Sequence, residues 1–89
     1  MPITKHNFMR HELIGLEVVV LESSDPSLKS LKGIVVDETK NMLKIEAGEK
    51  VKSVPKSVVH LRFTLPNGED VEIEGIRLVG RPEDRVRRG

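Results

Sequence analysis

The stretch that decides the fold is Gly33-Ile34-Val35-Val36-Asp37-Glu38-Thr39-Lys40-Asn41-Met42-Leu43-Lys44-Ile45. Two short apolar runs flank a group of polar, turn-forming residues, which is the pattern of a tight β-hairpin. If residues 38–41 form the loop, apolar side chains meet on one face, whereas a slip of one residue would oppose them to charged ones. The pairs that this register predicts are Val36 with Leu43, Ile34 with Ile45, Val35 with Lys44 and Gly33 with Glu46.

A second hairpin is predicted around Pro66-Asn67-Gly68, a three-residue loop in which the glycine takes the left-handed conformation. The run before it, Val58 to Leu65, alternates between apolar and polar residues. The loop length predicts the pairs Phe63 with Val71, Leu61 with Ile73 and Arg62 with Glu72. Apolar residues face apolar ones and the arginine faces a glutamate, so both faces of the hairpin support this register.

The remaining runs predict further strands separated by turns. Leu16 to Leu21 is almost entirely apolar and indicates a strand buried on both faces, and Val51 to Val54 indicates a short strand that Pro55 ends. Five or six short strands in one small domain are typical of an all-β, antiparallel β-barrel. The residues expected among its buried ones are Val18, Val20, Ile34, Val36, Leu43, Ile45, Leu61, Phe63, Val71 and Ile73.

Both ends of the chain are basic, although the net charge is only +1. Residues 76–89 carry five arginines against two acids, a net charge of +3, and residues 1–11 carry Lys5 and Arg10 with no acid. Short helices are predicted at both ends, over Thr4 to Leu13 and from Gly80 onward. Basic ends indicate a polyanionic partner, and the alternative is a pair of solvated tails. No apolar run reaches transmembrane length and the start is too charged for a signal peptide, so we expect a soluble, cytoplasmic protein without a membrane partner.

Residues that could carry chemistry are scattered through the sequence. The histidines at positions 6, 11 and 60 have no neighbouring cysteine, and the chain contains none. Asp70, Glu72 and Glu74 alternate along one strand, but Arg62 is expected opposite Glu72 as a solvated pair. Ser23-Ser24 lacks the sequence of a nucleophile elbow, and no glycine-rich phosphate loop is present. The sequence therefore predicts no catalytic residue, no metal site and no cofactor.

Nucleic-acid binding is compatible with the basic ends, but only through phosphate contacts. The two phenylalanines, Phe8 and Phe63, are too few for a surface on which bases stack. Phe63 is expected in the core, and Phe8 either in the core or in an interface. Arginine and lysine give affinity for phosphates without reading bases. Lys40 would lie at the tip of the first hairpin, with Asn41 as a neutral hydrogen-bonding neighbour. The predicted RNA-binding residues are Lys5, Arg10, Lys40, Asn41, Arg77, Arg81, Arg85, Arg87 and Arg88.

Three segments in the right order resemble archaeal ribonuclease P protein component 1, the Sm-like subunit of that enzyme. They are the first hairpin over residues 33–43, the run His11-Glu12-Leu13-Ile14-Gly15-Leu16, and the run Gly80-Arg81-Pro82-Glu83-Asp84-Arg85. The resemblance implies a six-stranded Sm-like barrel with short N- and C-terminal helices, so that residues 1–89 form one barrel domain with basic ends. Many members of that family continue past the third segment with a longer helix, which implies a shorter terminal RNA contact here.

The resemblance also implies a function and partners. The chain would bind ribonuclease P RNA in the ribonucleoprotein that removes the 5′ leader from precursor tRNA, with the RNA as the catalyst. The implied protein partner is the zinc-ribbon subunit, which would hold the zinc. Because the first strand and the residues before it carry more apolar surface than a small barrel can bury, we expect that subunit to dock on Phe8, Leu13 and Ile14.

Two other classes of function remain open. A generic Sm-like module would form homo-oligomeric rings on RNA, which needs a free edge strand on each copy. Pro55, beside the short fourth strand, counts against that pairing. An independent enzyme is the third alternative.

Overall fold

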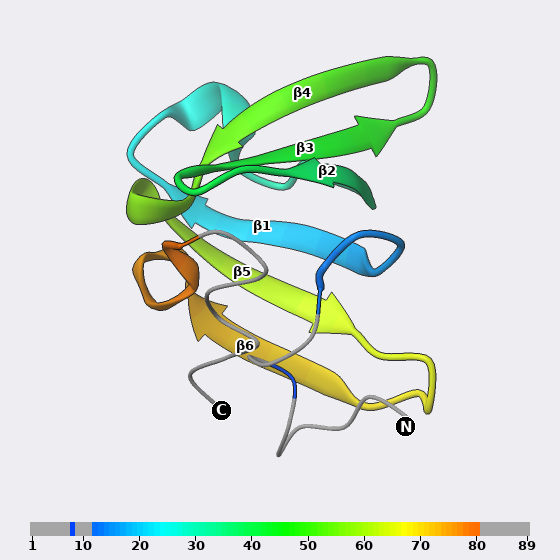
Figure 1. Ribbon diagram of the computed structural model, residues 1–89. Helices are drawn as coiled ribbons and strands as arrows, with labels where there is room; N and C mark the ends of the chain where they lie inside the picture. Colours follow the sequence, from blue (N-terminus) through cyan, green and yellow to red (C-terminus); the bar gives the residue numbers. More distant parts are fainter. Residues whose placement is uncertain (1–7, 9–11, 81–89) are drawn as a thin grey trace.

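The computed structural model describes Phe8 and residues 12–80, which contain six strands and three short 3-10 turns (Figure 1). The strands are β1 (Glu17–Ser23), β2 (Lys32–Glu38), β3 (Met42–Ala47), β4 (Lys50–Pro55), β5 (Val59–Thr64) and β6 (Asp70–Glu74). The turns are η2 (Pro26–Leu28), η3 (Lys56–Val58) and η4 (Gly75–Leu78). The described part contains no α-helix. The two predicted terminal helices fall almost entirely outside the described residues.

All six strands form one antiparallel sheet in the order β4-β3-β2-β1-β5-β6, with β2 to β4 on one side of β1 and β5 and β6 on the other (Figure 1). The six-stranded antiparallel architecture is confirmed, but closure into a barrel is wrong, because β4 and β6 do not pair. Pro55 ends β4, and η3 then carries the chain across to β5 on the far side of β1. The sheet therefore curves without closing.

One hydrophobic core joins the two halves of this curved sheet. Val35, Leu43 and Val54 come from β2, β3 and β4, whereas Phe63 and Ile73 come from β5 and β6, and all belong to the same buried cluster. Side chains from both edge strands can share a core only if the sheet folds over on itself. Phe8 also lies in this core, with its ring centroid 4.9 Å from that of Phe63.

The second hairpin is confirmed. Leu61 pairs with Ile73, Arg62 with Glu72 and Phe63 with Val71, as the loop length predicts. Gly68 has a φ of +88°, the left-handed conformation that this loop requires. Leu61, Phe63 and Ile73 are buried, and Val71 is half-buried at the edge strand.

The register predicted for the first hairpin is wrong, by one residue before a bulge in β2 and by two residues after it. The observed pairs are Ile34 with Glu46, Val35 with Ile45, Asp37 with Lys44 and Glu38 with Leu43. A bulge falls between Val35 and Asp37. Val35 is consequently buried, at 1% exposed, whereas Ile34 is 44% and Val36 38% exposed on the outer face.

Two inward-facing positions account for this register. The Glu38 side chain is fully buried, where it meets the ammonium of Lys56. At Gly33, an added Cβ would lie 2.1 Å from the Glu46 carbonyl oxygen and 2.9 Å from Ile45 Cγ2. The backbones of β2 and β3 therefore approach so closely at this position that only glycine fits. Val35 shares the inner face with Gly33 by strand alternation, and the bulge after Val35 brings Glu38 to the same face.

The first strand is divided between its two faces. Val18 and Val20 are buried, as expected, and Val19 and Leu21 are half-buried on the other face. A second bulge between Val20 and Glu22 shifts the pairing of β1 with β5. The prediction of burial on both faces therefore holds fully for only one of them.

The register of β2 can be tested with a matched pair of substitutions. Val35→Ala should lower the free energy of unfolding by about 2 kcal/mol, because it removes two buried methyl groups and leaves a cavity. Val36→Ala makes the same chemical change on the outer face and should cost less than about 0.5 kcal/mol. Urea denaturation of both variants measures the difference. A larger loss at Val36 would restore the register predicted from the sequence.

Candidate nucleic-acid interface

The ammonium of Lys56 lies at the junction between the first hairpin and the end of the described chain. Its side chain is 0% exposed, although lysine is among the residues least often buried. It donates hydrogen bonds to Glu38 Oε2 at 2.6 Å and to three backbone carbonyls. These carbonyls belong to Thr39 at 2.7 Å, Lys40 at 3.3 Å and Gly80 at 3.0 Å.

Two backbone hydrogen bonds strengthen the same junction. The Gly80 N–H donates to the Lys40 carbonyl at 2.7 Å, and the Lys56 N–H donates to the Asn41 carbonyl at 2.8 Å. The tip of the hairpin is thereby attached to η3 on one side and to Gly80 on the other. Within the tip, the Thr39 N–H donates to the Met42 carbonyl at 2.9 Å, which completes the turn.

The junction leaves polar side chains of the hairpin tip in solvent. Lys40 and Asn41 are exposed, while their carbonyls accept the hydrogen bonds just described. Arg77, in η4, is exposed as well. Gly80 is the residue from which the sequence continues into Arg81, so the hairpin tip and the origin of the arginine-rich segment are held together.

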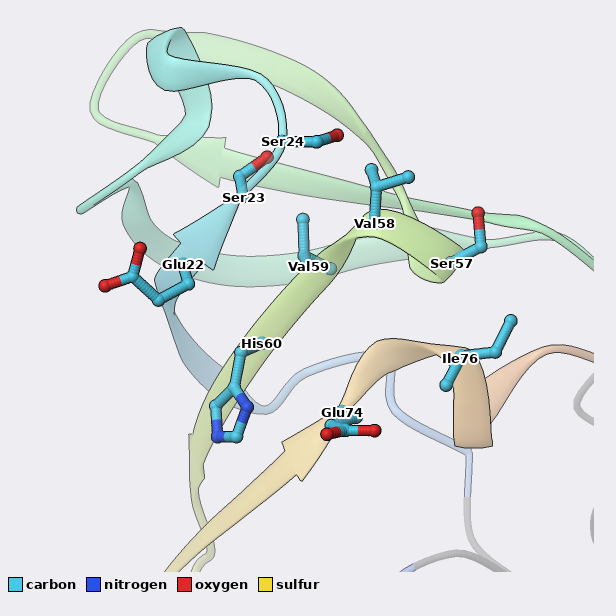
Figure 2. Close-up of a pocket in the computed structure, with 9 residues that line it drawn as sticks. All are labelled: Glu22, Ser23, Ser24, Ser57, Val58, Val59, His60, Glu74 and Ile76. Atoms are coloured by element: carbon cyan, nitrogen blue, oxygen red, sulfur yellow. The ribbon is translucent and has the colours of Figure 1, made fainter.

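Acidic side chains lie on the outer face of β1, β5 and β6. Glu22, His60 and Glu74 form one row across these strands, and His60 Nε2 lies 3.8 Å from Glu72 Oε2. A hollow opens beside this row (Figure 2), lined by Glu22, Ser23, Ser24, Ser57, Val58, Val59, His60, Glu74 and Ile76. The carboxylates of Glu22 and Glu74 in its lining would repel phosphates. No group of three potential metal ligands occurs among the described residues.

Comparison with known proteins assigns the chain to a family. The family model described as "Ribonuclease P/MRP, subunit p29" matches residues 6–88. The chain belongs to this family. Ribonuclease P protein component 1 of Methanosphaera stadtmanae is 45% identical over 86 residues, which cover 97% of this chain and 92% of that protein. The counterpart in Pyrococcus abyssi is 49% identical over 86 residues, which cover 97% of this chain and 67% of the relative.

A solved structure shows the same fold in this family. The structure of Mth11, described as a homologue of the human RNase P protein Rpp29, superposes with a TM-score of 0.63 at 46% sequence identity. The match covers 84% of this chain and 97% of Mth11. The resemblance that the hairpin and the two flanking runs indicated is therefore confirmed.

The described part of this p29-family chain holds only some of the predicted site residues. Lys40, Asn41 and Arg77 lie on the surface, and the first two sit at the hairpin tip. The predicted residues that fall outside the described part are Lys5, Arg10, Arg81, Arg85, Arg87 and Arg88. Among the residues described, no helix is long and apolar enough to cross a membrane.

The predicted docking residues separate into two kinds. Phe8 and Leu13 are buried in the core, where they cannot offer a surface to a partner, and Ile14 is 48% exposed. Most of the described apolar side chains before the first strand are thus buried in the core. Ile34 and Val36, which the sequence predicted to be buried, are the exposed apolar residues of the neighbouring strand β2.

Lys56 is the residue that sequence reasoning missed. It follows Pro55 in a run with no recognisable motif, and a lone lysine there reads as a solvated side chain. Glu38, predicted as part of the hairpin loop, is its partner 18 residues earlier. Nothing in the spacing of the two residues indicates that they pair, because the contact exists only once the sheet has curved.

Removing the Lys56 ammonium should destabilise the protein strongly. Lys56→Met takes the ammonium away from the buried Glu38 carboxylate and removes a donor from three carbonyls, so the free energy of unfolding should fall by about 3–5 kcal/mol. Lys50→Met is the matched control, since it makes the same change at an exposed position of β4. Urea denaturation compares the two. A loss below about 1 kcal/mol for Lys56→Met would contradict the importance of the junction.

Proposed function

We propose that this chain, as a ribonuclease P protein subunit, binds the ribonuclease P RNA and supports removal of the 5′ leader from precursor tRNA in the cytoplasm. In this proposal the RNA supplies the catalysis and the protein supplies contacts to phosphates. The observation that carries the proposal is the junction at Lys56. It joins the exposed Lys40 and Asn41 to Gly80, from which the arginine-rich segment continues.

The residues proposed to contact RNA combine one described group with segments outside the described part. Lys40 presents a long cation at a hairpin tip, where it can reach a phosphate without disturbing the core. Asn41 adds a neutral donor and acceptor beside it. The full proposed set is Lys5, Arg10, Lys40, Asn41, Arg77, Arg81, Arg85, Arg87 and Arg88.

Salt dependence of binding tests this proposal directly. Each phosphate contact that is lost should reduce the slope of log K against log salt concentration by about one unit. Lys40→Ala should therefore reduce the slope by about one, and Arg81→Ala with Arg85→Ala by about two. The titration uses the ribonuclease P RNA encoded in the same genome, at several salt concentrations.

Lys29→Ala is the control for this titration. Lys29 is an exposed lysine whose Nζ lies 3.5 Å from Glu22 Oε1, beside the acidic face. Its removal should leave the slope as it is. Unaltered slopes for the Lys40 and arginine variants, in folded protein, would overturn the proposed RNA surface.

An apolar patch around Ile14, Ile34 and Val36 is the proposed docking surface for the zinc-ribbon subunit. Ile34 and Val36 are exposed on the outer side of β2. The Gly15 N–H donates to the Val35 carbonyl at 2.7 Å, which brings the segment that begins at Ile14 alongside the same strand. Three exposed branched aliphatic side chains in one region are typical of a protein interface. Phe8 and Leu13, first expected in this contact, would support it from within the core.

Charged substitutions in the patch should break the complex. Ile14→Glu with Ile34→Glu should weaken binding of the zinc-ribbon subunit at least about a hundredfold, since two carboxylates would be buried unpaired. Ile76→Glu is the control, because Ile76 is equally exposed but lies in η4. Titration calorimetry gives the affinities, and mass measurement gives the stoichiometry. Unchanged affinity would place the interface elsewhere, and a hexamer or heptamer of the isolated chain would favour the ring alternative.

A further inference from the structure

We propose that Lys56 is a positioning residue for RNA binding: its buried ammonium holds the hairpin tip and the segment from η4 to Gly80 together, so that the exposed cations Lys40 and Arg77 engage the RNA together. This inference rests on the proposed function and names a residue that touches no phosphate. It predicts that the affinity for RNA depends on a lysine that is completely shielded from solvent.

Several chain segments meet at Lys56 Nζ. An ammonium has three N–H donors. Here they are shared among Glu38 Oε2 at the end of β2, the carbonyls of Thr39 and Lys40 in the hairpin tip, and the carbonyl of Gly80 beyond η4. These contacts span sequence separations of 16 to 24 residues. A single cation therefore fixes the distance between two segments proposed to bind RNA.

The hydrogen bonds that the Lys56 ammonium donates are directional. Burying a charge is expensive, and well-packed apolar residues often stabilise a core as well as a buried ion pair does. An apolar side chain at position 56 could fill the space, but it could not hold three carbonyl oxygens at set positions. The ammonium therefore contributes a defined geometry at the junction, in addition to any stability.

A second contact at the junction joins η3 to η4. At Gly75, the first residue of η4, an added Cβ would lie 2.1 Å from the Lys56 carbonyl oxygen. The backbones of η3 and η4 are thus in direct contact. The chain is held against Lys56 at Gly75 and again at Gly80, so a side chain at position 75 would force η3 and η4 apart and disturb the junction without changing Lys56 itself.

The backbone of Lys40 connects the geometry of the junction to the affinity for RNA. The Lys40 carbonyl accepts hydrogen bonds from Lys56 Nζ and from the Gly80 N–H, while the Lys40 side chain is exposed. Its backbone is therefore fixed and its ammonium is free to reach a phosphate. Arg77, in η4, is the exposed cation on the other side of the junction. Binding a polyanion with two cations that are already held relative to one another avoids the entropy cost of bringing them together. Releasing the junction should weaken binding without removing any phosphate contact.

The experiment measures Kd and its salt slope for the native chain, Lys56→Met, Gly75→Ala and Lys40→Ala, with the ribonuclease P RNA as the probe. Lys56→Met and Gly75→Ala should each raise Kd about tenfold at every salt concentration and leave the slope unchanged. Lys40→Ala should reduce the slope by about one unit. The matched control, Lys50→Met, should not show the parallel tenfold rise in Kd.

A double-mutant cycle provides a readout that a purely structural role would not alter. Lys40→Ala and Arg77→Ala should be non-additive in the native chain, because the junction holds the hairpin tip and η4 together. In the Gly75→Ala background their effects should become additive. Circular dichroism at the titration temperature establishes which variants are folded.

The outcomes separate this inference from the proposed function. Native-like Kd for folded Lys56→Met, or for Gly75→Ala if Lys56→Met does not fold, would overturn the positioning role while the salt slope of Lys40→Ala still supports the RNA surface. If neither Lys40→Ala nor Arg77→Ala changes binding, the proposed RNA surface fails and the positioning role fails with it.

Discussion

The contact between the Lys56 ammonium and the Glu38 carboxylate is the interaction on which the rest of the structure depends. Both side chains are fully buried, and Lys56 Nζ lies 2.6 Å from Glu38 Oε2. The same ammonium collects the carbonyls of Thr39, Lys40 and Gly80. An open sheet whose edge strands do not pair thereby gains a fixed attachment between its first hairpin and the residue that precedes the arginine-rich segment.

That contact also determines which apolar residues the protein leaves exposed. Glu38 must face inward to reach Lys56, and the bulge in β2 brings it to the same face as Val35. Ile34 and Val36 are left on the outer side, beside the segment that begins at Ile14. The buried ion pair and the exposed apolar patch are thus two consequences of one register.

Charge is divided between regions of the fold in a way that suits one orientation on RNA. The carboxylates of Glu17, Glu22, Asp70, Glu72 and Glu74 are exposed on the outer side of β1, β5 and β6. Lys40 projects from the hairpin tip, next to Gly80. In the proposed orientation on RNA, phosphates would be repelled by the first region and attracted to the second.

The sequence by itself determined the all-β class, the six strands, the second hairpin in its register and the membership of the p29 family. These depend on local information: the alternation along Val59–Thr64, the left-handed Gly68 and matching motifs. It also placed Lys40 and Asn41 at a hairpin tip. Only the tertiary structure decided the register of the first hairpin, the burial of Phe8 and Leu13 and the role of Lys56. Each of these depends on residues far apart in the chain, which approach only when the sheet curves, and a buried ion pair then outweighs the local apolar pattern of Ile34 and Val36.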